Sequence, residues 1–135
     1  PHGPPIRCIR RIEAITERRW LACAVLDEDH PGLDAGRLRS AYLIEIAAQA
    51  AAACAGLTNS AGTESQAGML VGLGNWTFNH GANHNDLTGQ ELTVTLDTGP
   101  RLGDLHAYEA SIYYGDQQLG AGSLRVMLKA PPDSI

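Results

Sequence analysis

The chain has 135 residues, 44% of them hydrophobic and 19% charged, and its 15 acidic and 10 basic residues give a net charge of −5 at pH 7. This length suits one domain with a single hydrophobic core, which we expect to span residues 1–135. The negative charge argues against nucleic acid as a partner, because phosphate binding needs a concentrated basic surface.

The first third of the chain predicts two strands followed by a turn-rich segment. Residues 6–16 alternate in part between apolar and polar side chains, which favours a strand. Residues 19–26 (R-W-L-A-C-A-V-L) form an apolar run between charged residues, the profile of a buried strand. Residues 27–37 (D-E-D-H-P-G-L-D-A-G-R) are rich in turn formers and lead directly into the next element.

Residues 40–57 (S-A-Y-L-I-E-I-A-A-Q-A-A-A-A-C-A-G-L) predict a long helix, with Gly56 as its stop. The segment is apolar nearly all round, so we expect it to be buried. Glu45 and Gln49 interrupt it and share one face, being four residues apart. Because a carboxylate in a buried helix is costly unless it is paired or functional, Glu45 is a candidate site residue. The same two residues argue against a membrane span, and a cytoplasmic location is expected.

The rest of the chain predicts β structure. The glycines of the first of these segments indicate a strand that is bulged at Gly72 or Gly74. The dipeptide Gly115-Asp116 predicts a turn between the last two strands. The predicted strands are residues 69–78, 91–97, 105–114 and 119–129.

The order of these elements predicts an α+β architecture. A single apolar helix needs a surface that covers most of its circumference, and one antiparallel sheet curled round it provides that surface. A second copy of the chain can cover the remaining face and edges of the sheet. This is the hotdog arrangement, an antiparallel sheet wrapped around one long central helix.

Other residues that often carry chemistry have structural interpretations here. The three cysteines are scattered without C-x-x-C spacing, which predicts neither a disulfide framework nor a zinc site. His80 and His84, with Asp86 close by, lie in a Gly/Asn-rich loop where helical i,i+4 geometry does not apply, so no metal site is predicted. His106 lies in an alternating segment and is expected on a half-buried strand face.

The stretch from His30 to Gly56 (H-P-G-L-D-A-G-R-L-R-S-A-Y-L-I-E-I-A-A-Q-A-A-A-A-C-A-G) resembles the β-hydroxyacyl-ACP dehydratases of the FabA/FabZ type. In that family a histidine in an H-F-P-G-like turn precedes a helix that reads roughly L-x-x-E-x-x-A-Q-A. The likeness is greatest to the ApeP-like branch, with its His-Pro turn and I-E-x-x-A-Q-A helix, and the later L-T-G-Q-E-L-T-V resembles the family's G-D-x-L-x-V strand. Here Pro31 follows the histidine directly, and Arg39-Ser40 stands where the plain fatty-acid enzymes have Pro-Gly.

The resemblance implies that His30 removes the proton α to a thioester carbonyl and that Glu45, from the other subunit, protonates the departing β-hydroxyl. A near-neutral histidine can accept that proton, and desolvation of a carboxyl favours the protonated form that an acid needs. Backbone N–H groups near Ser40, at the helix start, would bind the thioester oxygen. Gln49 would orient the acid, and Gly32 would allow a close approach of backbone to substrate.

The resemblance therefore predicts dehydration of a 3-hydroxyacyl thioester to the trans-2-enoyl thioester, in fatty-acid or polyene-type synthesis and without a cofactor. The implied partners are acyl carrier protein, for which Arg37 and Arg39 are candidate contacts, and a second subunit, identical or related. One alternative is a hotdog thioesterase, whose helix carboxylate activates water and has no need of His30. The other is a non-catalytic subunit that stabilises an active dehydratase.

Overall fold

The computed structural model describes residues 9–26, 33–34, 37–38, 40–58, 67–79, 87 and 89–129. In these residues six strands form one antiparallel sheet in the order β1-β2-β6-β7-β8-β5, and two short strands, β3 and β4, form a separate hairpin. The elements are β1 (Ile9–Ala14), β2 (Arg19–Val25), β3 (Leu33–Asp34), β4 (Arg37–Leu38), α1 (Ser40–Thr58), β5 (Ala67–Phe78), β6 (Glu91–Leu102), β7 (Leu105–Tyr114) and β8 (Gln117–Lys129).

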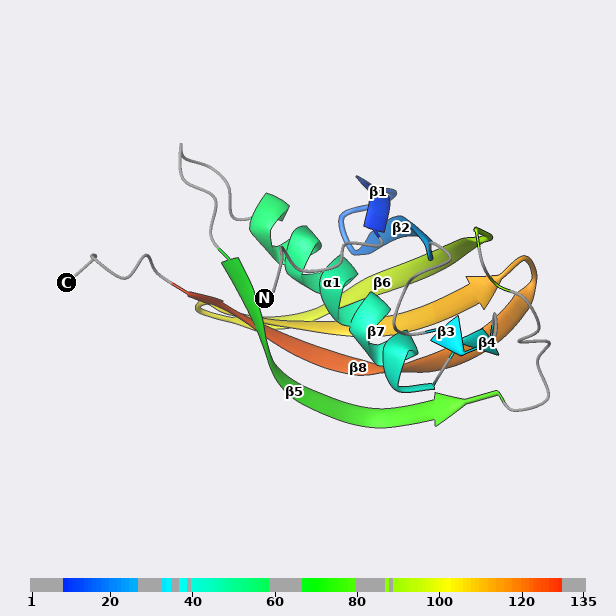
Figure 1. The fold of residues 1–135 in the computed structure, drawn as a ribbon. Coiled ribbons are helices and arrows are strands. Elements are labelled where there is room, and N and C mark those ends of the chain that lie inside the picture. Colours follow the sequence, from blue (N-terminus) through cyan, green and yellow to red (C-terminus); the bar gives the residue numbers. More distant parts are fainter. Residues whose placement is uncertain are drawn as a thin grey trace, which may run out of the picture.

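The helix α1 lies across the concave face of the curved sheet, so the predicted α+β architecture is confirmed (Figure 1). Its inward face is wholly buried, because apolar and small side chains recur there at helical spacing. Alanine at most of these positions keeps the helix backbone close to the strands beneath it. The fully buried residues of α1 are Leu43, Ile46, Ala47, Ala50, Ala51, Cys54 and Ala55.

The inward face of the sheet follows the two-residue period of its strands. Residues 105–114 form a strand as predicted, and His106, Tyr108, Ala110 and Ile112 all point to the core, with exposed fractions of 5% or less. His106 is thus more deeply buried than the half-buried position predicted for it. The predicted strands of residues 19–26 and 91–97 pair in register as β2 and β6.

The bulges predicted for the glycine-rich strand are confirmed, since the β5–β8 register shifts between Leu70 and Gly72 and again between Gly74 and Thr77. On the facing strand, Gly122 lies directly under the ring of Trp76, and a Cβ at this glycine would overlap that ring. The indole Nε1 of Trp76 donates a hydrogen bond to the carbonyl oxygen of Ser123, at 3.0 Å. The glycine therefore makes room for an aromatic side chain that packs on the core.

Two features differ from the sequence-based prediction. The strand predicted for residues 91–97 continues to Leu102, because a bulge between Thr98 and Arg101 allows its pairing with β7 to go on. The segment predicted as turn-rich contains the β3–β4 hairpin, in which Leu33 pairs with Leu38.

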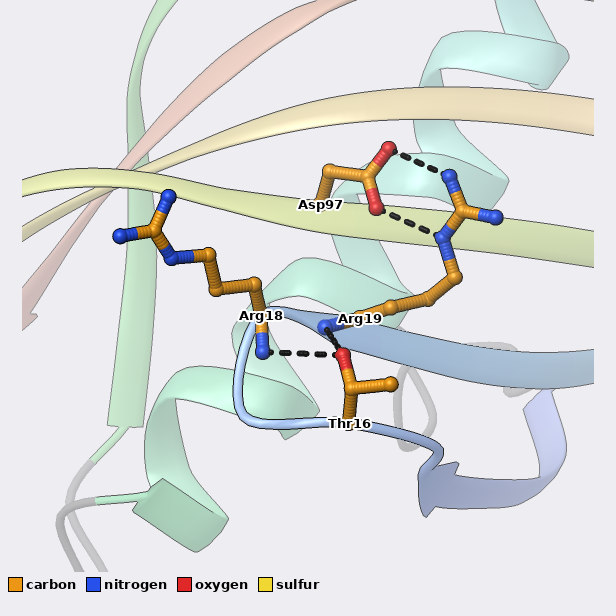
Figure 2. Close-up of polar contacts among 4 residues, drawn as sticks. All are labelled: Thr16, Arg18, Arg19 and Asp97. Carbon is orange, nitrogen blue, oxygen red and sulfur yellow. Dashed lines mark hydrogen bonds and ion pairs between the residues drawn. The ribbon is translucent and has the colours of Figure 1, made fainter.

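The turn between β1 and β2 is tied to the rest of the sheet by polar contacts (Figure 2). The Oγ1 of Thr16 accepts hydrogen bonds from the backbone N–H groups of Arg18 and Arg19, at 3.2 and 3.0 Å. The guanidinium of Arg19 binds both carboxylate oxygens of Asp97 on β6, at 2.7 and 2.9 Å. This paired contact, led by its hydrogen bonds, holds the pKa of Asp97 below its usual range.

Candidate active site

The face of α1 turned away from the sheet carries Glu45 and Gln49, the two strongly polar residues in the interior of the helix. They are one turn apart, and the amide Nε2 of Gln49 donates a hydrogen bond to Oε1 of Glu45 at 3.4 Å. The contact is long for a hydrogen bond, which makes it a weak one in this arrangement. The structure thus pairs these two predicted site residues directly.

The expectation that Glu45 would be buried is wrong for the single chain, in which this residue is exposed. The sheet covers one side of α1, and no described strand packs on the opposite side, where Glu45 is exposed and its neighbours are half-buried. Most of the residues on this open side are small and half-buried. Because they are small, another protein surface could approach the helix closely there. Beside Glu45 and Gln49, these residues are Ala48, Ala52, Ala53 and Gly56.

The helix start lies where the sequence predicts it, at Ser40. The backbone of Arg37 belongs to β4, in the hairpin beside this end of α1 (Figure 1). Three further predicted site residues, His30, Gly32 and Arg39, lie outside the described residues. The first turn of a helix offers unpaired N–H groups and a positive dipole end, so an oxyanion could be bound there.

The arginines near the start of the chain are engaged with neighbouring strands. Arg11 donates from a terminal guanidinium nitrogen to the Sγ of Cys23, at 3.1 Å, and lies 3.4 Å from the carboxylate of Glu91. Both charged side chains are largely exposed, so this ion pair adds little to stability. Arg19 is paired with Asp97 in the same way, at the other end of β2.

Two negative findings concern the part of the chain that the structure describes. Within it, no group of three or more His, Cys, Asp and Glu side chains lies close enough to hold a metal ion. The histidine pair at positions 80 and 84, together with Asp86, falls outside it. Among the described residues, no helix has the length and apolar character needed to cross a bilayer.

A second polar group lies inside the core, and the sequence analysis considered only one of its members, His106. The hydroxyl of Tyr108 is 3.5 Å from Nδ1 of His106, and the Cys54 thiol of α1 is its other neighbour. Burial, followed by the adjacent thiol, raises the pKa of Tyr108, so its hydroxyl stays protonated. The alternation of residues 105–114 predicts that the rings of His106 and Tyr108 point inward. The contact of Tyr108 with Cys54 of the helix depends on the tertiary fold.

The sheet order, the single helix lying in its concave face and the carboxylate on that helix define a hotdog-fold protein. A family model described as "ApeP-like: ApeP dehydratase" matches residues 1–134. The chain belongs to this ApeP-like dehydratase family, and the resemblance seen in its sequence is confirmed. A search among curated proteins finds none that matches.

Solved structures share the fold at low sequence identity. A chain of the dehydratase heterocomplex ApeI:P from Xenorhabdus doucetiae is 18% identical, with a TM-score of 0.78 over 96% of this chain and 87% of that one. A thioesterase from Haemophilus influenzae is 12% identical, with a TM-score of 0.65 over 91% and 80%. A variant of the fluoroacetyl-CoA-specific thioesterase FlK is 14% identical, with a TM-score of 0.62 over 83% and 92%. These likenesses concern the fold alone.

Proposed function

We propose that the chain takes part in the dehydration of a 3-hydroxyacyl thioester to the trans-2-enoyl thioester. The observation that carries this proposal is the Glu45–Gln49 pair on the open face of α1, in a chain that belongs to a dehydratase family. A carboxyl group held by a neighbouring amide is suited to deliver a proton to a leaving hydroxyl. The reaction needs no cofactor, since a base, an acid and an oxyanion site are sufficient.

In the proposed mechanism His30 takes the proton α to the carbonyl, and negative charge develops on the thioester oxygen. N–H groups in the first turn of α1, near Ser40, stabilise that charge. Gly32 has no side chain, so the backbone at this position can approach the substrate closely. Glu45 then protonates the β-hydroxyl, which leaves as water while the double bond forms. Gln49 keeps the carboxyl in position.

We propose that this site is completed by a second subunit, identical or related. Glu45 is exposed in the single chain, and covering the open face of α1 would desolvate the carboxyl and favour its protonated form. The edge strand β5 supports such an assembly, because it presents Val71 and Leu73 with 51% and 53% of their surface exposed. The related chain in ApeI:P belongs to a heterocomplex, which favours a related dehydratase subunit as the partner.

Acyl carrier protein is the proposed carrier of the substrate, with Arg37 and Arg39 as its contacts. Carrier proteins are acidic, and cationic side chains beside the helix start would meet them where the thioester enters. Replacing both arginines with glutamate should slow turnover of a carrier-linked substrate more than that of a short free thioester. Equal effects on the two substrates would count against this docking site.

The test of the reaction is an assay of 3-hydroxyacyl thioester with the protein alone and with its partner subunit, read by mass spectrometry. Glu45→Gln and His30→Ala should each lower the rate of enoyl thioester formation at least a hundredfold. This is the usual contribution of a general acid or base to the reaction rate. Glu109→Gln is the matched control, since that carboxylate is exposed on the opposite face of the sheet. If neither variant changes the rate, a non-catalytic stabilising role replaces the proposal.

A hotdog thioesterase is the second candidate. The same Glu45–Gln49 pair could activate a water molecule to attack the thioester carbonyl, and two of the structural neighbours are thioesterases. The assay above separates the two reactions because hydrolysis releases a free thiol whereas dehydration does not. Thiol release that survives His30→Ala and is lost in Glu45→Gln would favour the thioesterase.

A further inference from the structure

The convex face of the sheet, opposite to α1, carries a row of large apolar side chains. Leu102 on β6 lies directly opposite Leu105 on β7. Leu105 lies opposite Met127 on β8, which in turn lies opposite Met69 on β5. Side chains directly opposite each other on antiparallel strands share one face of the sheet. Because Leu105 precedes the core-facing His106, the face that these four share is the outer one.

This apolar row is accessible from solvent. Leu102, Met69 and Met127 expose 73%, 44% and 37% of their surface, and Leu105 is half-buried. Within the described part of the chain no helix or strand lies over the row, because α1 occupies the concave face (Figure 1). The solvent face of an antiparallel sheet is normally polar, so a contiguous apolar row across four strands indicates a contact surface.

Beyond this row, the outer face of β7 and β8 carries two unlike charges, each beside a small side chain. Arg125 on β8 lies opposite Ala107 on β7, and Glu109 on β7 lies opposite Ser123 on β8. Arg125 and Glu109 are both exposed. Neither of them takes part in an ion pair with any other residue that the structure describes. Both charges are therefore available to a second surface.

The pattern on this face is complementary to itself. A two-fold axis parallel to the strands, midway between β7 and β8, places β7 of one copy over β8 of another. Each residue then faces, in the other copy, the residue with which it pairs in its own sheet. Leu105 of one copy therefore meets Met127 of the other, and the two ends of the row, Leu102 and Met69, meet in the same way. Sheets packed face to face lie about 10 Å apart, a gap that these side chains fill from both sides.

The same axis brings the two unlike charges together. Arg125 of one copy faces Ala107 of the other, whose small side chain leaves room for the guanidinium. Glu109 of that second copy lies two residues further along the same face of β7, about 7 Å away, which a long arginine side chain can span. Symmetry forms this ion pair twice, and no like charges face each other across β7 and β8. Such pairs fix the orientation of a contact more than they raise its affinity.

We propose that the convex face of the sheet binds a second copy of this chain, back to back, through the apolar row and the paired charges of Arg125 and Glu109. The contact leaves the outer edge of β5 and the open side of α1 free, so it is independent of the proposed reaction and its subunit interface. Because it includes no strand pairing, we expect a weak contact with a dissociation constant of about 10 μM. At the much lower concentrations of an activity assay or a size-exclusion column the copies are apart.

The experiment is sedimentation equilibrium of the full chain at concentrations from about 1 to 200 μM, where the average mass should rise twofold. Arg125→Glu and Glu109→Arg should each weaken this association at least tenfold, because like charges then face each other twice. An equimolar mixture of the two variants should associate as the original chain does, since the introduced glutamate of one meets the introduced arginine of the other. Recovery in the mixture also shows that both variants are folded.

A further variant tests the apolar row. Met127→Lys should weaken the association at least tenfold, whereas Ile15→Lys, at an exposed apolar residue of the β1–β2 turn, is the matched control and should leave it unchanged. The association should also persist when Val71→Lys and Leu73→Lys are combined at the β5 edge. A constant mass over the concentration range, a mixture no better than either charge variant alone, or an association lost only through the β5 variants would each overturn the proposal.

Discussion

Gln49 donates to the carboxylate of Glu45 across one turn of α1, with 3.4 Å between Nε2 and Oε1. The pair is formed within one helix, so it exists before any partner or substrate is bound. The hydrogen bond is long, so it can shorten when the proposed second subunit covers the open face of the helix. Gln49 is therefore expected to position the carboxyl of Glu45, the proposed acid.

Gln49→Leu should lower kcat about tenfold with little change in KM, because the carboxyl loses its orientation while the substrate-binding groups remain. Gln49→Glu should have a larger effect, since it adds a like charge one turn from Glu45. Steady-state kinetics on a 3-hydroxyacyl thioester measures both. Gln118→Leu, at an exposed position on β8, is the control. An equal loss of kcat in that variant would contradict a positioning role for Gln49.

The edge of β5 should mediate assembly with the second subunit. Val71→Lys combined with Leu73→Lys places two charges on this edge, and we expect the assembly to dissociate to single chains in light scattering after size exclusion. Leu102→Lys is the matched control, because Leu102 is 73% exposed and lies at the β6–β7 hairpin. An assembly that persists in the double variant, or that is lost equally in the control, contradicts an interface at β5.

Gly122→Ala should destabilise the fold by about 1–3 kcal/mol, because the added methyl group overlaps the Trp76 ring and that ring cannot move freely. Denaturant unfolding measures the change. Gly72→Ala on the facing strand should cost much less, since its Cβ would meet only the flexible Arg125 side chain at 3.4 Å. In a Trp76→Leu background the penalty at position 122 should shrink, and a penalty that stays unchanged would show that the overlap is not its cause.

His106 should make the stability of the chain depend on pH. Its pKa is lowered in the folded state, so from about pH 6.5 downward the unfolded chain binds a proton that the folded chain does not. The free energy of unfolding should therefore fall as the pH is lowered from about 7.5 to 5. His106→Gln removes this contribution and should show a shallower decline, because the other four histidines are the same in both proteins. Parallel pH profiles for the two proteins would contradict the prediction.

Much of the fold could be predicted because its patterns are local. The residues of β7 alternate between the two faces of the strand from Leu105 to Ile112, and the run from Ser40 to Leu57 contains strong helix formers up to Gly56. Their bounds therefore agree with the structure to within a residue. The extension of β6 was not predicted, because T-G-P-R reads as a turn and is retained in the strand only by pairing with β7.

The site could be predicted only in part. The four-residue spacing of Glu45 and Gln49 fixes their contact, but an alanine-rich helix has no clear apolar stripe, and so the sequence did not show that these residues face away from the sheet. The hollow between Thr16, Leu57 and Arg101 was not predicted, since it depends on a turn at Thr16 meeting a hairpin at Arg101, eighty-five positions later in the chain.

The outer edge of β5, to which no described strand is paired, also bears on how the chain must be produced in a cell. A copy synthesised in excess of its partner exposes open backbone N–H and C=O groups next to Val71 and Leu73, a template onto which any other unpaired strand can add. Under the proposed assembly with a second subunit, matched synthesis of the two subunits is then a condition for keeping the chain in solution. The edge of β5 that would pair with a second subunit is therefore also the surface through which an unpaired copy would aggregate.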